Sequence, residues 1–215
     1  YSGLDRQSMV AKGIWSDFQM AKANIIKYAI NKEKDTLFLD SDIIITNVIN
    51  GIDNTKEIGV SPQYIKKKYL LETGYYNGGM LWTKNKNVPH KWIEYTKNSR
   101  YFDQASIDDL VNEYENFKFG ENYNVQCWRY LLSNEPKETI ASYITSKPHD
   151  KLYYKSEPLK FIHTHFLDPR FNQFNIIILN HLQNANMYKI LAIIYRVIHN
   201  KWLIKIPKQP LNGIA

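Results

Sequence analysis

The sequence predicts an α/β domain in which a mixed, mainly parallel β-sheet is flanked by helices. The first observation is the order of elements: a helical pattern at residues 16–30, a polar turn at 31–35 and an apolar strand at 36–39. The second is size, because 215 residues with 44% hydrophobic content can bury a sizeable core. No internal repeat or low-complexity linker interrupts the chain.

The first helix is predicted from its start signal and its period. Ser16 followed by Gln19 fits a capping box. Apolar residues then recur on one face of the helix, at Phe18, Ala21, Ile25 and Ala29. The apolar strand at residues 36–39 is bounded by the polar turn before it and by two carboxylates after it.

Two more strands and two more helices are predicted downstream. Residues 57–61 read as a strand, and residues 75–82 bring a glycine pair into the start of another. Pro89 opens a helix that runs to about residue 97. Asp103 is expected to cap the next helix. The apolar face of that helix holds Ile107, Leu110, Val111 and Tyr114.

The last third of the chain contains a strand and a long helical region. Residues 160–166 alternate like a strand, residues 174–200 read as one broken helix or two, and a basic tail follows. An apolar stripe at Ile190, Leu191, Ile194 and Ile198 is surrounded by basic residues. One interpretation is an interfacial helix that contacts acidic lipid, and the other is a helix packed on the sheet with a solvated basic face.

Composition narrows the partners and the compartment. A net charge of +7 favours anionic partners such as nucleotides and phosphates, although scattered solvated lysines would give the same charge. Cys127 is the sole cysteine, so no intrachain disulfide forms and nothing indicates an oxidising compartment. No cleavable signal pattern and no membrane-spanning apolar run is seen. We expect a cytoplasmic protein, peripheral to a membrane under the first interpretation of the C-terminal helix, and no nucleic-acid partner.

Asp40 and Asp42 follow the apolar strand, one residue apart, and a second apolar run follows them. Ligands of open α/β sheets bind at the carboxyl ends of strands. Two carboxylates this close repel each other, and a divalent cation offsets that repulsion by taking their oxygens as ligands. The alternative is a turn in which both side chains cap backbone amides.

Strands that end in Asp-x-Asp also occur in phosphatases of the haloacid dehalogenase type, where the first Asp is the nucleophile. Those enzymes place Thr or Val where this chain has Ile44, and they need a later paired-acid motif at a strand end. The paired acids at residues 107–110 lie in a helical pattern instead. This reading remains the alternative enzyme.

Three further motifs carry polar groups. Asn77, Gly78 and Gly79 would let a ligand approach the backbone closely, although glycine pairs also mark bulges and turns. Asp103 and Gln104 stand at a helix start, as a polar anchor or as a simple cap. In a strand, His163 and His165 share one face, where they could bind a metal or a phosphate, whereas a lone histidine is more often structural.

The order "LFLDSDIII", "YYNGGMLW", "FDQAS", "ENYN", "FIHTHF" resembles the GT-A glycosyltransferases. It is most similar to their glycogenin-like and galactosyltransferase-like retaining group. That group has a strand ending in Asp-x-Asp, an Asn-x-Gly strand start, Asp-Gln at a helix start, Tyr-Asn near a loop and a late metal-binding His. The resemblance spans residues 18–166.

The resemblance implies a hexosyltransferase with a GT-A-like fold, a nucleoside-diphosphate-sugar donor, UDP-linked by expectation, and a Mn²⁺ or Mg²⁺ ion. The acceptor would be a glycan, a protein or a lipid. The implied metal ligands are Asp40, Asp42 and His165, and His163 is the alternative to His165. Asp40 would also face the ribose. The donor-binding residues implied are Lys22, Asn77, Gly78 and Gly79. Asp103 and Gln104 would lie beneath the reacting sugar as the catalytic residues.

The chain departs from the family pattern at two places. The family opens with a strand and helix that hold the nucleotide base, and this chain reaches Asp40 too soon for a full unit of that kind. We therefore expect a catalytic domain at residues 1–170 without the first nucleotide-binding strand, and a helical, basic extension at 171–215. The family's Lys-Pro-Trp after the late His is replaced here, so Arg170 is expected near the diphosphate. A catalytically silent glycan-binding fragment is the non-enzymatic alternative.

Overall fold

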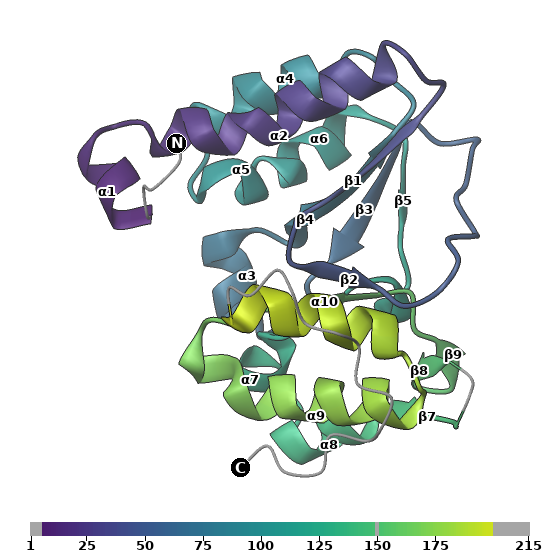
Figure 1. Ribbon diagram of the computed structural model, residues 1–215. Coiled ribbons are helices and arrows are strands. Elements are labelled where there is room, and N and C mark those ends of the chain that lie inside the picture. Colours follow the sequence, from purple (N-terminus) through teal and green to yellow (C-terminus); the bar gives the residue numbers. More distant parts are fainter. Residues whose placement is uncertain (1–5, 149–150, 200–215) are drawn as a thin grey trace. The chain divides into compact units, whose positions relative to one another are not determined.

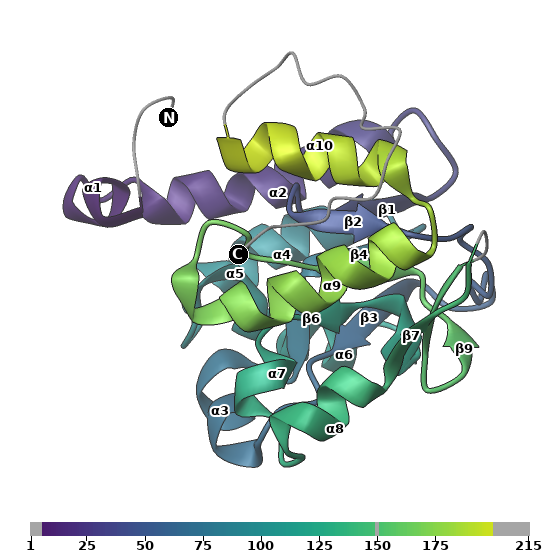
Figure 2. The same cartoon turned by 60° about the horizontal axis from the view of Figure 1, so that its bottom comes forward.

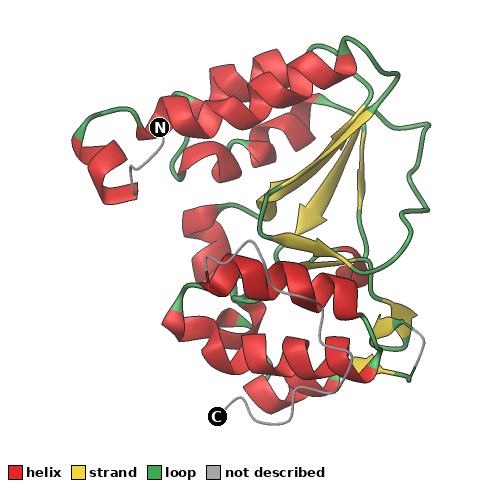
Figure 3. Cartoon of the chain, viewed as in Figure 1, coloured by secondary structure: helices red, strands yellow, loops and turns green. Residues whose placement is uncertain are grey.

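The computed structural model describes residues 6–148 and 151–199, and the chain forms two compact units. Unit 1 comprises Tyr1–Ser41 and Gly51–Phe119, and unit 2 comprises Asp42–Asn50 and Gly120–Ala215. Both units contain helices and strands, as Figure 3 shows by colour. The mixed α/β class expected from the sequence is therefore confirmed.

Unit 1 is built on one four-stranded sheet with helices packed against it (Figure 1). Its described strands are β1 (Thr36–Leu39), β3 (Ile58–Pro62), β4 (Tyr76–Thr83) and β5 (Asn116–Lys118). Its described helices are α1 (Arg6–Ala11), α2 (Trp15–Ile30), α3 (Lys67–Thr73), α4 (Val88–Thr96), α5 (Phe102–Ala105) and α6 (Ile107–Glu113). The strands and helices predicted for this part of the sequence are thus present, with small shifts at their ends.

The strand order in unit 1 is β1-β4-β3-β5. Strand β4 lies between β1 and β3, and all eight of its residues are buried. Strand β1, predicted as an apolar strand, is at the edge of the sheet and its four residues are half-buried. The Asp-x-Asp stretch therefore follows an edge strand.

The sheets are not mainly parallel, which corrects the expectation. Among the described residues, two strand pairs are parallel (β3–β5 and β6–β10) and five are antiparallel (β1–β4, β3–β4, β2–β10, β7–β8 and β8–β9). Tyr76, the first residue of β4, pairs with Pro62, the last residue of β3. The connection through α3 therefore returns the chain to the sheet beside the end of β3, and β4 runs antiparallel to β3.

Helix α2 has its expected length but buries a different face. The predicted face contains Phe18 and Ile25, which are 37% and 57% exposed. The residues that are buried are Gln19, Ala23, Ile26 and Ile30. The helix begins at Trp15 without a side-chain capping bond, so the capping box was also wrong. The reason is tertiary: Gln19, although polar, is buried because its amide bonds to Asp103.

The hydrophobic core of unit 1 lies between the sheet and the helices α2, α4 and α6, which Figure 1 shows on one side of the strands. It contains Ala23, Ile26, Ile58, Val60, Tyr76, Leu81, Val88, Trp92, Ile107 and Leu110. Val111 and Tyr114, predicted on the same face of α6, pack against it. This packing fixes α2, β4 and α5, the elements that carry the polar residues described below.

Unit 2 contains two three-stranded sheets, ordered β2-β10-β6 and β7-β8-β9. Its described strands are β2 (Ile43–Ile45), β6 (Val125–Gln126), β7 (Ile144–Ser146), β8 (Leu152–Tyr154), β9 (Glu157–Pro158) and β10 (Phe161–His163). Its described helices are α7 (Arg129–Leu132), α8 (Lys137–Ser142), α9 (Asn172–Asn184) and α10 (Tyr188–His199), with short 3₁₀ turns η1 (Glu121–Tyr123) and η2 (Pro169–Phe171). The extension expected from residue 171 belongs to the same compact unit as residues 120–170.

The C-terminal helical region consists of two helices, α9 and α10, which lie side by side in Figures 1 and 2. The apolar stripe of α10 packs inside unit 2, because Leu191 and Ile194 belong to its core and Ile190 and Ile198 pack against that core. This favours the packed helix over the interfacial helix. The basic tail from residue 200 lies outside the described residues. Within those residues, every helix is too short or too polar to cross a bilayer.

Candidate functional site

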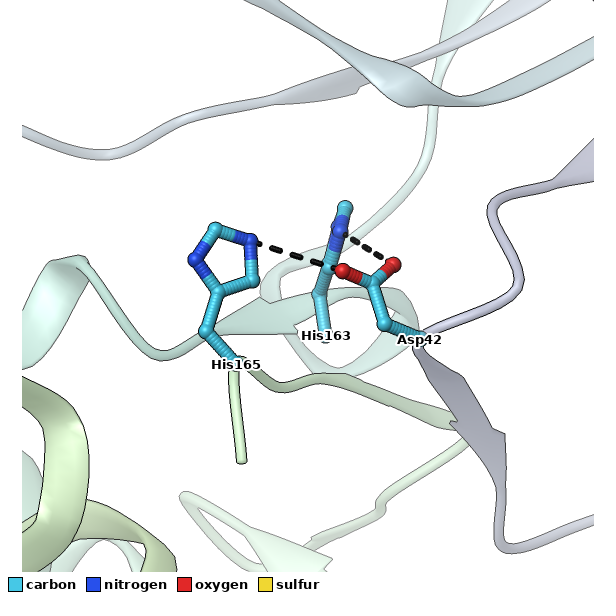
Figure 4. A group of neighbouring side chains, drawn as sticks. All are labelled: Asp42, His163 and His165. Atoms are coloured by element: carbon cyan, nitrogen blue, oxygen red, sulfur yellow. Dashed lines mark ion pairs between the residues drawn. The ribbon is translucent and has the colours of Figure 1, made fainter. Parts of the chain in front are cut away.

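Three side chains that are far apart in the sequence converge in unit 2: Asp42, His163 and His165. We call them the histidine cluster (Figure 4). The Nε2 atom of His163 lies 3.0 Å from one carboxylate oxygen of Asp42, and the Nε2 atom of His165 lies 3.5 Å from the other. One ligand atom from each residue can be chosen so that all lie within 4.8 Å of one another. The predicted pair of histidines and the second aspartate therefore meet at one point.

Strand pairing holds this cluster together. His163 ends β10 and pairs with Ile43 of β2, the residue directly after Asp42. The backbone oxygen of Asp42 accepts hydrogen bonds from the amide of Thr164 at 3.1 Å and from its hydroxyl at 3.0 Å. His165 lies beyond the strand, yet its ring turns to the same carboxylate. The register of β2 and β10 therefore sets which residues face Asp42.

The electrostatics of the histidine cluster suit a cation. Burial opposes ionisation of Asp42, but the hydrogen bond from His163 and the nearby imidazoles outweigh it, so the pKa of this carboxyl lies below its usual value. Burial lowers the pKa of His165 from its ordinary value of 6.5, against the attraction of Asp42. At pH 7 the cluster thus offers an ionised carboxylate and a neutral imidazole at residue 165, which are the forms that bind metals.

The donor set fits a divalent transition metal. Two imidazole nitrogens and a carboxylate are ligands typical of Mn²⁺, Fe²⁺, Co²⁺ and Zn²⁺, whereas Mg²⁺ prefers oxygen ligands and retained waters. The side chains of Asp42 and His165 are 42% and 38% exposed, so the cluster is open on one side. A metal held there would keep coordination positions for a substrate.

A second group of polar side chains lies in unit 1, and we call Gln19, Lys22, Asp40 and Asp103 the lysine cluster. The Nζ atom of Lys22 lies 3.1 Å from a carboxylate oxygen of Asp40 and 3.1 Å from one of Asp103. Gln19 donates from Nε2 to the other oxygen of Asp103 at 2.8 Å. One face of α2 thus supplies both groups that bind Asp103.

The two charged partners of Lys22 differ in burial. The side chain of Asp40 is 24% exposed, and that of Asp103 is 6% exposed. Burial raises the pKa of Asp103 more than Lys22 lowers it. For Lys22, burial acts to lower the pKa, but the charges and hydrogen bonds of Asp103 and Asp40 raise it above its usual value. Lys22 is therefore a cation shared by two neighbouring carboxylates.

The glycine pair and Gln104 join the same region through hydrogen bonds. Gln104 accepts from the side-chain amide of Asn77 at 3.2 Å and from the backbone of Gly78 at 3.3 Å. Asn77 accepts from the backbone of Gly79 at 3.2 Å, and Gly79 accepts from the amide of Asp40 at 2.8 Å. All five residues were predicted as site residues, and the structure connects them.

Gly78 allows α5 to approach β4. A Cβ atom at this position would lie 3.0 Å from a carboxylate oxygen of Asp103 and 3.3 Å from the Cα of Gln104. The backbone oxygen of Gly78 also accepts a hydrogen bond from the Nζ atom of Lys22, on α2, at 3.4 Å. The glycine here serves contact between two elements of unit 1.

Asp103 is not a helix cap, which corrects that prediction. It is the second residue of α5, the N-cap position of that helix is Tyr101, and the carboxylate of Asp103 binds Lys22 and Gln19. Its backbone oxygen accepts from Trp92 Nε1 at 2.8 Å. Phe102, just before it, has a φ of +48°, a strained conformation for a bulky residue. The surrounding packing therefore fixes the direction of Asp103 at a cost in backbone strain.

Asp40 and Arg170 do not have the partners that the sequence interpretation gave them. Asp40 pairs with Lys22 in unit 1 and is not among the three grouped metal-ligating residues. Arg170, expected near a diphosphate, pairs with Asp168 at 2.5 Å in η2. Sequence reasoning missed Gln19, which it assigned to a capping box. Its spacing of three from Lys22, on one helix face, was the signal that could have placed the two together.

Comparisons with family models, with curated proteins and with solved structures find no match for this chain.

Proposed function

We propose that this protein transfers a sugar from a nucleoside-diphosphate donor to an acceptor hydroxyl, with a divalent metal held by Asp42, His163 and His165. The observation that carries the proposal is the convergence of two imidazoles on the second carboxylate of an Asp-x-Asp stretch. The resemblance to GT-A glycosyltransferases supplies the reaction class, and the arrangement of the predicted residues supports it.

The chemistry explains why such a site needs a cation. Negative charge accumulates on the departing diphosphate as the glycosidic bond breaks, and a bound metal would neutralise that charge. Asp42 and the two histidines hold the ion, and their exposed side leaves room for phosphate oxygens. Because two of the three protein ligands are imidazoles, we expect Mn²⁺ to support activity better than Mg²⁺.

The resemblance, and not a contact with the histidine cluster, assigns Lys22 and Asp40 of the lysine cluster to the donor. Lys22 supplies a buried positive charge next to Asp40, the first carboxylate of the Asp-x-Asp stretch. Asp103 is 4% exposed, one of its oxygens accepts from Gln19 and the other lies 3.1 Å from Lys22, so it orients Lys22 and does not act as a free base. This favours a reaction in which the departing phosphate takes the acceptor proton, as in the retaining group that the sequence resembles.

The phosphatase alternative is weaker on this structure. It needs a second acidic pair at a strand end, and the paired acids Asp108 and Asp109 lie in helix α6. Asp108 is engaged by the amide of Tyr75 at 2.9 Å and by Arg100 at 2.6 Å. That carboxylate therefore performs a structural task in unit 1.

The test is release of UDP from a panel of UDP-sugars, with and without Mn²⁺, by the full chain. We expect Mn²⁺-dependent release that Asp42→Asn abolishes and that Lys22→Met strongly reduces. The matched control is His181→Ala, because His181 is a half-buried histidine of unit 2 that bonds to Ser146 and lies outside both clusters. This variant should retain activity.

Two results would overturn the proposal. The first is a folded parent protein that binds Mn²⁺ but releases no nucleoside diphosphate from any donor of the panel. The second is hydrolysis of p-nitrophenyl phosphate with Mg²⁺ in place of sugar transfer, which would assign the phosphatase reaction. A folded protein with neither activity would instead support the glycan-binding fragment.

A further inference from the structure

The rings of both histidines in the histidine cluster pack against one tryptophan. The ring centroid of Trp128 lies 4.8 Å from that of His163, at an interplanar angle of 68°, and 5.6 Å from that of His165, at 51°. The two imidazoles lie 5.9 Å apart. We propose that Trp128 is a positioning residue that fixes both imidazoles toward Asp42, an inference that rests on the metal-binding role in the proposed function.

The backbone that carries Trp128 is tied to the strand that carries the histidines. Strand β6 is parallel to β10, with Gln126 opposite His163. The amide of Cys127 then donates to the backbone oxygen of His163 at 2.9 Å. Trp128 follows at the start of α7, where its own backbone oxygen accepts from the amides of Leu131 and Leu132. Its position relative to His163 is therefore set by backbone hydrogen bonds.

The two histidines depend on Trp128 to different degrees. His163 is a strand residue and is 3% exposed, so its neighbours in the sheet also restrict it. His165 lies after the end of β10, and its side chain is 38% exposed. Its described ring contacts are with Trp128, His163 and Phe171. Removal of the indole should therefore increase the rotational freedom of the His165 ring more than that of the His163 ring.

Ring direction matters because a metal accepts an imidazole only along the nitrogen lone pair. Rotation of either ring about its bond to Cβ would swing Nε2 away from Asp42. Groups that orient metal-ligating side chains typically change metal affinity by about 10–100-fold when they are removed. Trp128 would restrict the rotation of both imidazole rings by packing against them.

The experiment compares Trp128→Phe, Trp128→Leu and Trp128→Ala in the full chain. Mn²⁺ affinity is measured by isothermal titration calorimetry and by electron paramagnetic resonance of free Mn²⁺. We expect Trp128→Ala and Trp128→Leu to weaken Mn²⁺ binding by about 10–100-fold. Trp128→Phe, which keeps an aromatic wall, should restore most of the affinity. Leucine fills much of the space, so a loss in that variant is not explained by a cavity.

A spectroscopic readout separates positioning from general support of the fold. At saturating Co²⁺, the visible absorption bands report the ligand geometry, and they should change in the leucine and alanine variants and return in the phenylalanine variant. The matched control is Tyr188→Ala, because Tyr188 also packs against the core of unit 2 and its hydroxyl bonds to Asn186, outside the histidine cluster. This control should leave the Co²⁺ spectrum unchanged.

Several outcomes would overturn the inference. One is a folded Trp128→Leu variant that binds Mn²⁺ as tightly as the parent. Another is an unchanged Co²⁺ spectrum in that variant. The third is a parent protein that does not bind Mn²⁺. The experiment measures metal binding alone, so its result is distinct from that of the sugar-transfer assay. Protein that binds Mn²⁺ in a Trp128-dependent way but transfers no sugar would refute the proposed function and leave the role of Trp128 intact.

Discussion

Replacement of Lys22 by methionine tests the lysine cluster, because it leaves Asp103 buried without its cation. Lys22 lies 3.1 Å from both Asp40 and Asp103, and the side chain of Asp103 is 6% exposed. Removal of one partner from a buried ion pair typically costs about 3–5 kcal/mol. The remaining carboxyl can escape its charge by taking a proton, which sets an upper limit on the loss.

That limit follows from the ordinary pKa of 3.8 for the Asp103 carboxyl. At pH 7 protonation costs about 1.36 × (7 − 3.8), or roughly 4.4 kcal/mol. We therefore expect Lys22→Met to lower the free energy of unfolding by about 3–4 kcal/mol at pH 7. At pH 5 the same limit falls to about 1.36 × (5 − 3.8), or roughly 1.6 kcal/mol.

The stability difference between Lys22→Met and the parent depends on pH through the carboxyl of Asp103. Burial already raises the pKa of Asp103 in the parent, and removal of Lys22 raises it further. The folded variant then binds a proton at a pH at which the unfolded chain does not. Lowering the pH from 7 to 5 therefore stabilises the folded variant relative to the parent. The difference between the two proteins should shrink by more than half.

The measurement is urea unfolding of both proteins at pH 7 and pH 5, followed by circular dichroism. Hydrogen exchange of the β4 amides assigns the loss to unit 1. The double variant Lys22→Met/Asp103→Asn removes both charges and should recover much of the stability. The matched control is Lys91→Met, because Lys91 also faces two carboxylates, Glu94 at 3.2 Å and Glu113 at 3.8 Å, on the surface.

The reasoning is wrong if Lys22→Met loses the same free energy at both pH values. It is also wrong if Lys91→Met costs as much as Lys22→Met. In the first case Asp103 does not carry the uncompensated charge, and in the second case burial does not determine the strength of the pair.

Two further predictions concern the metal and the backbone. Mn²⁺ at about 100 times its dissociation constant should raise the free energy of unfolding by about 2.7 kcal/mol, and Asp42→Asn should remove this gain in a thermal-shift titration. Gly74→Ala should cost about 1–3 kcal/mol in urea unfolding, because Gly74 has a φ of +98° and the new Cβ would lie 2.8 Å from the Cα of Ala105. Gly13→Ala, with a φ of +69° and nothing within 4 Å, should cost less. The metal prediction is contradicted if Mn²⁺ stabilises Asp42→Asn as much as it stabilises the parent. The backbone prediction is contradicted if Gly74→Ala is as stable as the parent.

The element types were predictable where the local pattern was strong. The helix at Trp15–Ile30 and the strands at Thr36–Leu39 and Tyr76–Thr83 follow from periodicity and turn residues, within a residue or so at their ends. The face that each element buries was less predictable. Apolar residues of α2 recur at helical spacing on two faces, and core packing buries the face with Ala23 and Ile26 while Ile25 stays exposed. Periodicity does not say which of the two faces is buried.

The residues of the candidate site were also identified from the sequence, although not their grouping. Polar residues at strand ends and beside glycines stand out in an apolar pattern, and this selected Asp40, Asp42, Asn77, Asp103 and His163. The sequence interpretation placed Asp40 and Asp42 on one metal. In the structure, Asp40 pairs with Lys22 in unit 1, whereas Asp42 faces the histidines in unit 2.

The sequence by itself determined the α/β class, the positions of most helices and strands, and the residue types suited to a metal and a phosphate. Local spacing contains these properties because each depends on neighbours within a few turns or strand residues. Only the tertiary structure decided the antiparallel course of β4, the half-buried edge position of β1, the buried face of α2 and the contact of Trp128 with two imidazoles. Each of these depends on segments distant in the chain, and their pairing is set by strand register and core packing.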